Sequence, residues 1–368
     1  MKIAFDYQIF MMQSFGGVSR YCTRLGQELV SLGENPRFIA PIHRNRYLGG
    51  ASKKIVYGTE FQRFPRKSGP LISFVNGILC QREIARWNPE ILHETYYSKK
   101  RMHANGAARV LTVHDMIHEK FPSDFSRRDG TPSRKKIAAL RADHIIAISE
   151  STKRDLCDIF AIPEKKVSVV HHGFDKLLSP NSATNSMAQH RPFLLYVGSR
   201  GGYKNFNGLL RAVSSQPLLM HDFDIIAFGG GEFNKSEQIF ISSLGFRTGA
   251  VQQIGGGDSV LGDLYRVASA FVYPSLYEGF GLPPLEAMAH DCPVVASNTS
   301  SMPEVIGAAG EYFDPVDLDH MADAICRVVF DQARQAELIA EGQMQLELYS
   351  WARCAAETRD IYKQVLEG

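Results

Sequence analysis

The chain has 368 residues, of which 44% are hydrophobic and 22% charged, and its formal net charge is +2 at pH 7. This composition is typical of a globular protein and excludes the disordered and fibrous classes. No run of about 18 or more apolar residues occurs in the sequence, which excludes an ordinary membrane-spanning helix. The length suits two domains of roughly 180 residues each.

The small net charge hides an asymmetry between the two halves of the chain. Residues 1–180 hold 29 Lys and Arg against 17 Asp and Glu, whereas residues 181–368 hold 12 against 22. An anionic partner for the first half, such as a membrane surface, and a merely solvated basic surface both fit this pattern. The first half contains four basic clusters, at Arg66-Lys67, Lys99-Lys100-Arg101, Arg127-Arg128 and Arg134-Lys135-Lys136.

The six cysteines are scattered, with no C-x-x-C pair and no histidine at zinc-ligand spacing. This pattern is typical of reduced thiols in a cytoplasmic protein and argues against a structural metal. The N-terminal MKIAFDYQIF lacks a long apolar segment and a cleavage site, so we interpret it as a first strand and not as a signal peptide. We expect no metal and no cofactor.

Short apolar runs alternate with helical patterns along most of the chain, which predicts βα units and parallel sheets. Residues 178–191 are polar and lack periodicity, so we interpret them as a linker. Before this linker, strands are predicted at residues 2–6, 37–40, 90–93, 110–113, 144–148 and 167–170, and helices at 18–32, 71–87, 133–142 and 151–160.

After the linker the same alternation resumes. It predicts strands at 193–197, 225–228, 251–254, 270–273 and 294–296, and helices at 207–214, 258–268, 285–290, 318–331, 333–348 and 351–366. We therefore predict an α/β protein with two doubly wound, Rossmann-like domains at 1–180 and 181–350 and a final helix at 351–368. Ligands bind such sheets at the carboxyl ends of the strands, so we expect an active site in the cleft between the domains.

The most informative stretch is YPSLYEGFGLPPLEAM, residues 273–288, which joins an apolar strand to a helix opened by Pro283-Pro284. Gly279 and Gly281 let the backbone come close to a ligand, and amides at the start of the helix suit a phosphate. Glu278 and Glu286 are good acceptors for sugar hydroxyls. The alternative is that the two glutamates only cap the helix or lie on its surface.

A second stretch, residues 198–205 with the sequence GSRGGYKN, follows the first strand after the linker. Its glycines form a flexible loop that brings Arg200 and Lys204 in front of a helix. Two cations in such a loop suit a leaving diphosphate, and ordinary exposed loop cations are the alternative.

Three weaker candidates lie in the first half. Gly16-Gly17 joins the first strand to the first helix and allows tight phosphate approach, although such a pair is often only a turn. His114 ends an apolar strand at the expected cleft edge, a position where a lone histidine is more often structural. Ser149 ends another strand, and a helix N-cap explains it equally well.

These motifs resemble the retaining glycosyltransferases of the GT4 family, the glycosyl transferases group 1. EGFGLPPLEAM, residues 278–288, is similar to the family's E-G-F-G-L-P-x-L-E-A-M run, and PVVASN at 293–298 and PEV at 303–305 extend the match. The resemblance is strong over residues 193–315 and weaker before them. It implies the GT-B fold, with the C-terminal helix packing back toward the first domain.

The resemblance also implies roles for the donor-side candidates. Glu286 would bind the ribose hydroxyls, and Glu278 would bind a hydroxyl of the transferred sugar. The diphosphate would meet two sets of groups, namely the cations Arg200 and Lys204 and the backbone of Phe280, Gly281 and Leu282.

On the other side, the resemblance places Gly16 and Gly17 in a loop facing the donor phosphates and the acceptor. It places His114 near the sugar and Ser149 at a family strand end. Asp291 stands where the family commonly has Gly, and because Asp tolerates left-handed turns we expect the fold to accept it. Asp222-Phe223-Asp224 mimics a metal motif of another transferase fold, and we interpret it as a turn.

The implied function is retaining, metal-independent transfer of a hexose from a nucleoside-diphosphate sugar to a saccharide or lipid-linked saccharide. GDP-mannose or a UDP-hexose is favoured as donor, dTDP-rhamnose stays open, and cell-surface polysaccharide or O-antigen assembly is the expected setting. We expect a cytoplasmic protein, with peripheral attachment to the inner face of the membrane left open, and no nucleic-acid partner.

The sequence also bears on three other functions. An NAD-dependent dehydrogenase would need G-x-G-x-x-G after the first strand, which is missing. A phosphorylase of the same architecture would need a pyridoxal-phosphate lysine, for which the sequence gives no argument. A non-catalytic sugar-nucleotide-binding or scaffold subunit of a polysaccharide assembly complex stays open.

Overall fold

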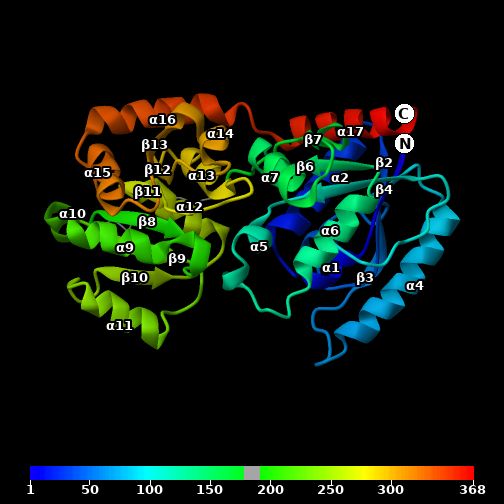
Figure 1. Ribbon diagram of the computed structural model, residues 1–368, viewed down its shortest axis with the longest axis horizontal. Coiled ribbons are helices and arrows are strands. Elements are labelled where there is room, and N and C mark those ends of the chain that lie inside the picture. Colours follow the sequence, from blue (N-terminus) through cyan, green and yellow to red (C-terminus); the bar gives the residue numbers. More distant parts are fainter. Residues whose placement is uncertain (178–190) are drawn as a thin grey trace. The chain divides into compact units, whose positions relative to one another are not determined.

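The structure is a computed structural model that describes residues 1–177 and 191–368. The predicted linker at 178–191 lies outside the described residues except for Arg191. The chain forms two compact units (Figure 1). Unit 1 comprises residues 1–120, 126–173 and 350–368, and unit 2 comprises residues 121–125 and 174–349.

Unit 1 is built on a parallel sheet with the strand order β3-β2-β1-β4-β5-β6-β7. A parallel sheet needs crossover connections, and helices supply most of them here. The strands are β1 (Lys2–Phe5), β2 (Asn35–His43), β3 (Val56–Glu60), β4 (Ile91–Glu94), β5 (Ala108–Val113), β6 (His144–Ala147) and β7 (Val167–Val169).

The two faces of this sheet are covered by different helices because side chains alternate along each strand. Ile3 and Phe5 of β1 face a core shared with α2 and α17, whereas Ala4 between them faces Cys80 and Ile84 of α4. The helices of unit 1 are α1 (Gln8–Met12), α2 (Gly17–Ser31), α3 (Arg46–Gly49), α4 (Gly69–Trp87), α5 (Ile117–Lys120), α6 (Thr131–Arg141), α7 (Glu150–Phe160) and α17 (Trp351–Glu367), with 3-10 turns at Pro122–Asp124, in unit 2, and Glu164–Lys166.

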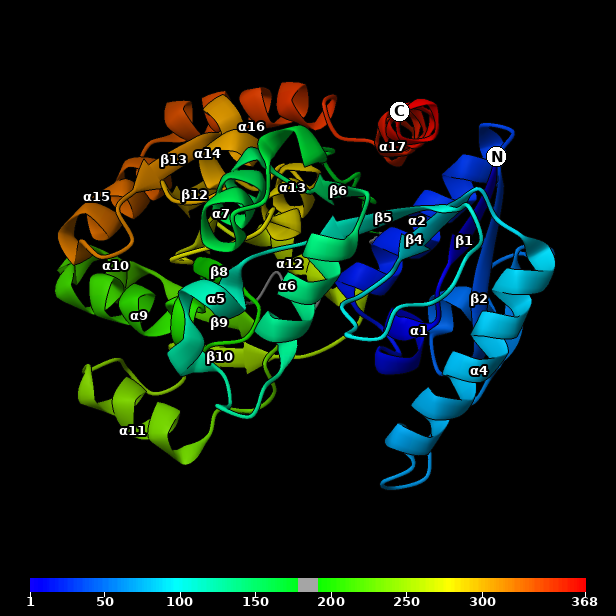
Figure 2. The same ribbon diagram turned by 45° about the vertical axis from the view of Figure 1, so that its right-hand side comes forward.

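Helix α17 comes from the far end of the chain and packs within unit 1 against α2 and β5 (Figures 1 and 2). Trp351, Cys354 and Tyr362 are buried in the same core as Tyr21 of α2. The His93 ring, at the end of β4, lies with its Nδ1 2.5 Å from the Tyr362 hydroxyl. The return of the C-terminal helix to the first domain, implied by the resemblance, is thus present.

Unit 2 contains a second parallel sheet, with the order β10-β9-β8-β11-β12-β13. Apolar runs such as FLLYV in β8 are buried because α9 and α15 pack on one face and α12 and α13 on the other. The strands are β8 (Phe193–Val197), β9 (Asp224–Phe228), β10 (Val251–Ile254), β11 (Ala270–Tyr273), β12 (Val294–Ser297) and β13 (Gly310–Phe313).

The helices of unit 2 alternate with these strands. They are α9 (Phe206–Ser215), α10 (Pro217–Asp222), α11 (Lys235–Ser243), α12 (Asp258–Val267), α13 (Leu282–Met288), α14 (Met302–Ile306), α15 (Leu318–Val329) and α16 (Gln332–Leu346), with 3-10 turns at Gly202–Lys204 and Gly307–Ala309. Asp291, which follows α13, has a φ of +57°, so the expected left-handed turn is confirmed.

The strands absent from the prediction lie at sheet edges, and several short helices, such as α1, α3 and α10, were also absent from it. Strands β3 and β13 end their sheets, and each carries polar or half-exposed residues in place of a continuous apolar run. Helix α11 buries no residue fully, and its Phe240 and Ile241 pack on the core only partly buried. Strands and helices are predicted from the spacing of apolar residues, which reflects which side chains are buried. These segments bury few side chains, so their spacing gives little information.

Candidate active site

The centre of the site in unit 2 is the loop between β11 and α13, which carries Glu278. The Glu278 side chain is buried, and its Oε1 lies 2.5 Å from the Nζ of Lys204. Lys204 ends the 3-10 turn Gly202–Lys204, which follows β8. The two predicted stretches thus meet, because β8 and β11 are neighbouring parallel strands whose carboxyl ends share one edge of the sheet.

A row of hydroxyls from the loop after β12 fixes the backbone around Glu278. The amide of Glu278 donates to Ser300 Oγ at 2.9 Å, and Ser301 Oγ donates to the carbonyls of Glu278 at 2.9 Å and Phe280 at 2.8 Å. Ser297 Oγ donates to the carbonyl of Ser275 at 2.6 Å. These bonds hold the loop rigid before any ligand arrives.

The first turn of α13 offers few amide donors. Pro283 and Pro284 have no N–H, so backbone donors near the start of this helix come from residues 280–282. Gly281 has a φ of +108°, a conformation that side-chain-bearing residues rarely adopt. Glu286 lies half-buried in α13, and its carbonyl accepts from His290 Nδ1 at 2.8 Å.

Lys204 is held by aromatic neighbours as well as by Glu278. Its Nζ lies 5.4 Å from the ring centre of Tyr203 and 5.6 Å from that of Tyr273, distances at which a cation is attracted to a ring face. The backbone of Tyr203 also anchors the Glu278 loop, because its carbonyl accepts from the Leu276 amide at 2.7 Å. The lysine turn and the glutamate loop are therefore one connected structure.

Arg200 differs from the sequence expectation. All five guanidinium N–H donors are used: two reach Glu237, at 2.7 and 3.3 Å, and three reach the carbonyls of Gly229, Gly231 and Glu232, at 2.9 to 3.1 Å. In this arrangement the guanidinium has no donor left for a phosphate. Three of its hydrogen bonds fix the backbone of the glycine loop that follows β9.

The glycine loop itself explains why glycines are needed there. Gly229, Gly230 and Gly231 all have positive φ values, from +70° to +87°. A Cβ on Gly230 would lie 2.6 Å from a guanidinium nitrogen of Arg200. A side chain would therefore be strained at all three positions and would collide with the arginine at the middle one.

The supporting residues were not predicted from the sequence. Asp124 accepts the Tyr203 amide at 2.8 Å, and residues 121–125 belong to unit 2 although their neighbours in the chain belong to unit 1. Ser300, Ser301 and Glu237 act through contacts between segments far apart in the chain. The visible signal was the hydroxyl-rich run SNTSS at 297–301 directly after an apolar strand.

In unit 1, Gly16 and Gly17 lie at the start of α2; they join it to the short helix α1, whereas the sequence predicted a direct connection to the first strand. Gly16 is the N-cap, and a Cβ there would lie 2.4 Å from Gln13 Oε1, whereas a Cβ on Gly17 would meet nothing within 4 Å. Gln13 Oε1 accepts the Ser19 amide at 3.2 Å. The pair therefore opens the helix, and Gly17 lies exposed with open space at its Cβ position.

His114 directly follows β5 and is almost completely buried. It stacks on His172 with 5.6 Å between ring centres and meets Tyr21 edge-on at 5.2 Å. Burial lowers the pKa of His114 to about 4, with Asp115 acting in the opposite direction. The imidazole is therefore neutral at pH 7 and can exchange hydrogen bonds with a hydroxyl without carrying charge.

Ser149 and His93 have structural partners. Ser149 is the N-cap of α7, where its Oγ accepts the Thr152 amide at 3.0 Å. His93 contacts the Tyr362 hydroxyl at 2.5 Å and Thr112 Oγ1 at 2.9 Å, one through each ring nitrogen. Both ring nitrogens of His93 are therefore occupied within the core.

The residues of the D-x-D pattern are spread over a helix end and a strand start. Asp222 ends α10 and lies 2.7 Å from His221, whereas Asp224 begins β9 and pairs with Arg247. Within residues 1–177 and 191–368 no group of three or more His, Cys, Asp or Glu is placed to hold a metal ion. In the same described ranges, no helix combines the length and apolar character needed to span a bilayer.

Two family models match the chain. Residues 181–345 match the glycosyl transferases group 1, and residues 15–176 match glycosyltransferase family 4. The fold is also found in sucrose-phosphate synthase from Thermosynechococcus elongatus, with a TM-score of 0.78 and 20% identity over 100% of this chain and 99% of that one.

Among related sequences, the O-antigen chain mannosyltransferase B of Escherichia coli is 31% identical over 230 residues. That alignment covers 60% of this chain and 60% of the relative. The serotype-specific mannosyltransferase WbdA of Escherichia coli is 29% identical over 279 residues, 70% of this chain and 34% of the relative. The chain thus spans less than two thirds of the length of either relative. Taken together, the two family models and the fold of paired parallel sheets show that the chain belongs to the GT4-type glycosyltransferases, whose fold is GT-B.

Proposed function

We propose that this protein transfers a hexose from a nucleoside-diphosphate sugar to a hydroxyl of a saccharide acceptor, with retention at the anomeric carbon and without a metal. The observation that carries the proposal is the Lys204–Glu278 pair, 2.5 Å long, on a loop fixed by serine hydroxyls. It combines a cation for a leaving diphosphate with a carboxylate that can accept from a sugar hydroxyl.

The catalytic effect would come from charge stabilisation. Negative charge grows on the diphosphate as the glycosidic bond breaks, so a fixed cation stabilises the transition state more than the bound donor. We assign this task to Lys204, aided by backbone amides of Phe280, Gly281 and Leu282. Glu286, on α13, would accept from the ribose hydroxyls.

Arg200 would act indirectly, without contacting the donor. Since its donors are used by Glu237 and the glycine loop, we propose that it shapes the part of the donor site after β9. In unit 1, the acceptor side would use neutral His114 and the loop at Gly16 and Gly17. Ser149 would hold the start of α7, where a family serine is expected.

GDP-mannose is the first donor to test, because both relatives described above are mannosyltransferases by name; UDP-hexoses and dTDP-rhamnose follow. The acceptor we propose is a growing polysaccharide such as an O-antigen, carried on a lipid at the inner face of the cytoplasmic membrane.

The test is thermal unfolding with GDP, UDP, dTDP and ADP in turn, followed by assay of nucleotide release from the matching sugar nucleotide. We expect one nucleotide to raise the unfolding midpoint and Glu286→Ala to remove that shift. Binding without release in the presence of saccharide acceptors would favour a non-catalytic sugar-nucleotide-binding subunit. No shift with any nucleotide would contradict the donor site.

A further inference from the structure

Helix α4 of unit 1 is apolar on two opposite sides. Its inner side places Cys80 and Ile84 under the sheet. Its outer side carries Leu71, Phe74 and Ile78, which are 65%, 57% and 41% exposed. Their spacing of three and four residues aligns them in one stripe. A helix that is apolar around most of its circumference is normally covered on both sides.

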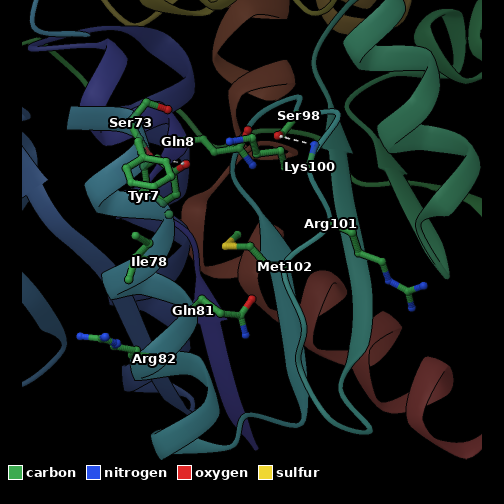
Figure 3. Close-up of a pocket in the computed structure, with 12 residues that line it drawn as sticks. Tyr7, Gln8, Ser73, Ile78, Gln81, Arg82, Ser98, Lys100, Arg101 and Met102 are labelled. Carbon is green, nitrogen blue, oxygen red and sulfur yellow. Dashed lines mark hydrogen bonds between the residues drawn. The ribbon is translucent and has the colours of Figure 1, made fainter. Parts of the chain in front are cut away.

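Phe74 and Ile78 of the outer stripe line a cavity of about 410 Å³ (Figure 3). One wall is α4, the other is the segment 98–102 after β4, and Tyr7 and Gln8 after β1 close one end. Figure 3 shows Ile78 and Met102 reaching into the space from opposite walls. The cavity therefore lies beside the carboxyl ends of β1 and β4, the edge where doubly wound sheets bind ligands.

The polar groups of this cavity are positively charged or neutral. Lys100 lies at the wall with its Nζ 6.0 Å from the Phe74 ring centre, and Arg82 and Arg101 extend outward from the two walls (Figure 3). Tyr7 donates its hydroxyl to the Ser73 carbonyl at 3.3 Å. Among the described residues that line the cavity, none is Asp or Glu.

We propose that this cavity binds the lipid end of the acceptor, a hydrocarbon chain that carries a phosphate or diphosphate. The inference rests on the proposed function, since it assigns a subsite to the lipid carrier. Phe74, Ile78 and Met102 would contact the chain. Lys100, with Arg82 and Arg101 at the rim, would attract the phosphate.

The composition of the cavity favours this ligand over a sugar. Saccharide subsites need acceptors for many hydroxyl protons, and carboxylates are the strongest of these. This lining supplies cations, apolar side chains and a few neutral polar groups, but no carboxylate among its described residues. An apolar chain would gain about fourfold in affinity for each methylene that it buries. A chain that enters the cavity would contact both of its walls, whereas a flat bilayer surface would contact only the outer stripe.

The direct test is calorimetric titration of the full chain with farnesyl diphosphate below its micelle-forming concentration. Inorganic diphosphate and farnesol supply the two halves of the probe separately. We expect farnesyl diphosphate to bind at least tenfold more tightly than either half, since both the chain and the phosphate contribute. Equal affinity for inorganic diphosphate would contradict the proposal.

Matched variants locate the binding. Ile78→Ser should weaken binding about fivefold, whereas Ile159→Ser, on α7 and 42% exposed, should leave it unchanged. Lys100→Ala should weaken it about threefold to tenfold, while Lys99→Ala, next to it but outside the cavity lining, should not. Loss of binding in both members of a pair, or in neither, would overturn the assignment.

Two further outcomes separate this subsite from the nucleotide site and from a membrane-docking surface. Displacement of the probe by GDP or UDP, or its loss in Lys204→Ala, would mean that its diphosphate occupies the nucleotide site, which contradicts the proposal. Binding only to vesicles of phosphatidylglycerol would identify a membrane-docking surface and no chain pocket. The nucleotide-shift experiment is tied to unit 2 by Glu286→Ala, whereas this titration is tied to unit 1 by the Ile78 and Lys100 variants, so the failure of one is distinguishable from the failure of the other.

Discussion

The ammonium of Lys204 and the carboxylate of Glu278 lie 2.5 Å apart, with side chains only 16% and 9% exposed. Each charge is compensated by the other while no diphosphate is bound. A diphosphate near Lys204 would compete for the ammonium and leave Glu278 to accept from a sugar hydroxyl. We therefore expect the pair to couple the departure of the nucleotide to the hydrogen bond between Glu278 and the sugar.

Replacing Lys204 by Met should lower kcat about 10²- to 10³-fold, the usual effect of losing one preorganised group at a site of growing negative charge. It should also cost about 1–3 kcal/mol of folding stability, because Glu278 then stays buried without its partner. Nucleotide-release kinetics and urea unfolding measure the two effects. The double variant Lys204→Met, Glu278→Gln should recover much of the folding stability and none of the activity. Equal stability of the single and double variants would contradict the contribution of the Lys204–Glu278 pair to folding.

Ser301→Ala should loosen the Glu278 loop. The change removes both hydrogen bonds from Ser301 Oγ, to the carbonyls of Glu278 and Phe280, and should destabilise the protein by about 1–3 kcal/mol. We expect the KM for the donor to rise as well. Ser243→Ala is the control, because that serine is exposed and bonds only the Phe240 carbonyl of its own helix. Similar kinetics for the two variants would show that the brace has no role in the site.

The role of Arg200 can be separated from that of Lys204 through Glu237. If Arg200 only positions the glycine loop, then Glu237→Ala, which removes two of its five hydrogen bonds, should reproduce the direction of the Arg200→Ala effect. Both variants should raise the KM for the donor several-fold and lower kcat little. A large fall in kcat for Arg200→Ala alone would instead indicate direct contact with the diphosphate.

The buried histidines should make the protein sensitive to acid. Burial lowers the pKa of His93 to about 3 and of His114 to about 4, from 6.5. Below pH 6.5 the unfolded chain takes up protons that the folded chain refuses, so stability falls as the pH drops toward 4. His114→Gln should flatten this decline by up to about 3 kcal/mol between pH 6.5 and 4. Urea unfolding at several pH values measures the free energy of unfolding of each protein. Parallel plots of this free energy against pH for the variant and the parent would contradict the prediction.

The main elements and the Glu278 stretch could be predicted because their signals are local. The run FLLYV of β8 and the change from strand to helix around Gly281 are visible within about ten residues. The left-handed turn at Asp291 follows from the same local reasoning. The edge strands β3 and β13 were missed because their exposed or polar residues leave no continuous apolar run.

The supporting contacts could not be predicted from the sequence because they join residues far apart in the chain. Ser301 lies 23 positions from Glu278 along the chain, and Arg200 lies 37 positions from Glu237. Such pairs form only when neighbouring strands bring their loops together. Arg200 shows the consequence: its residue type suited a phosphate, but its neighbours in space use every donor that it has.

The packing of α17 into the core of unit 1 has a consequence for how the chain is made. Trp351 and Tyr362 fill the same core as Phe5 and Tyr21, so unit 1 cannot complete this core until residues 350–368 have left the ribosome. Most of unit 2, residues 174–349, emerges earlier. During synthesis unit 1 therefore completes its core only after residues 174–349 of unit 2 have emerged, and until then its unfilled core is accessible to a chaperone.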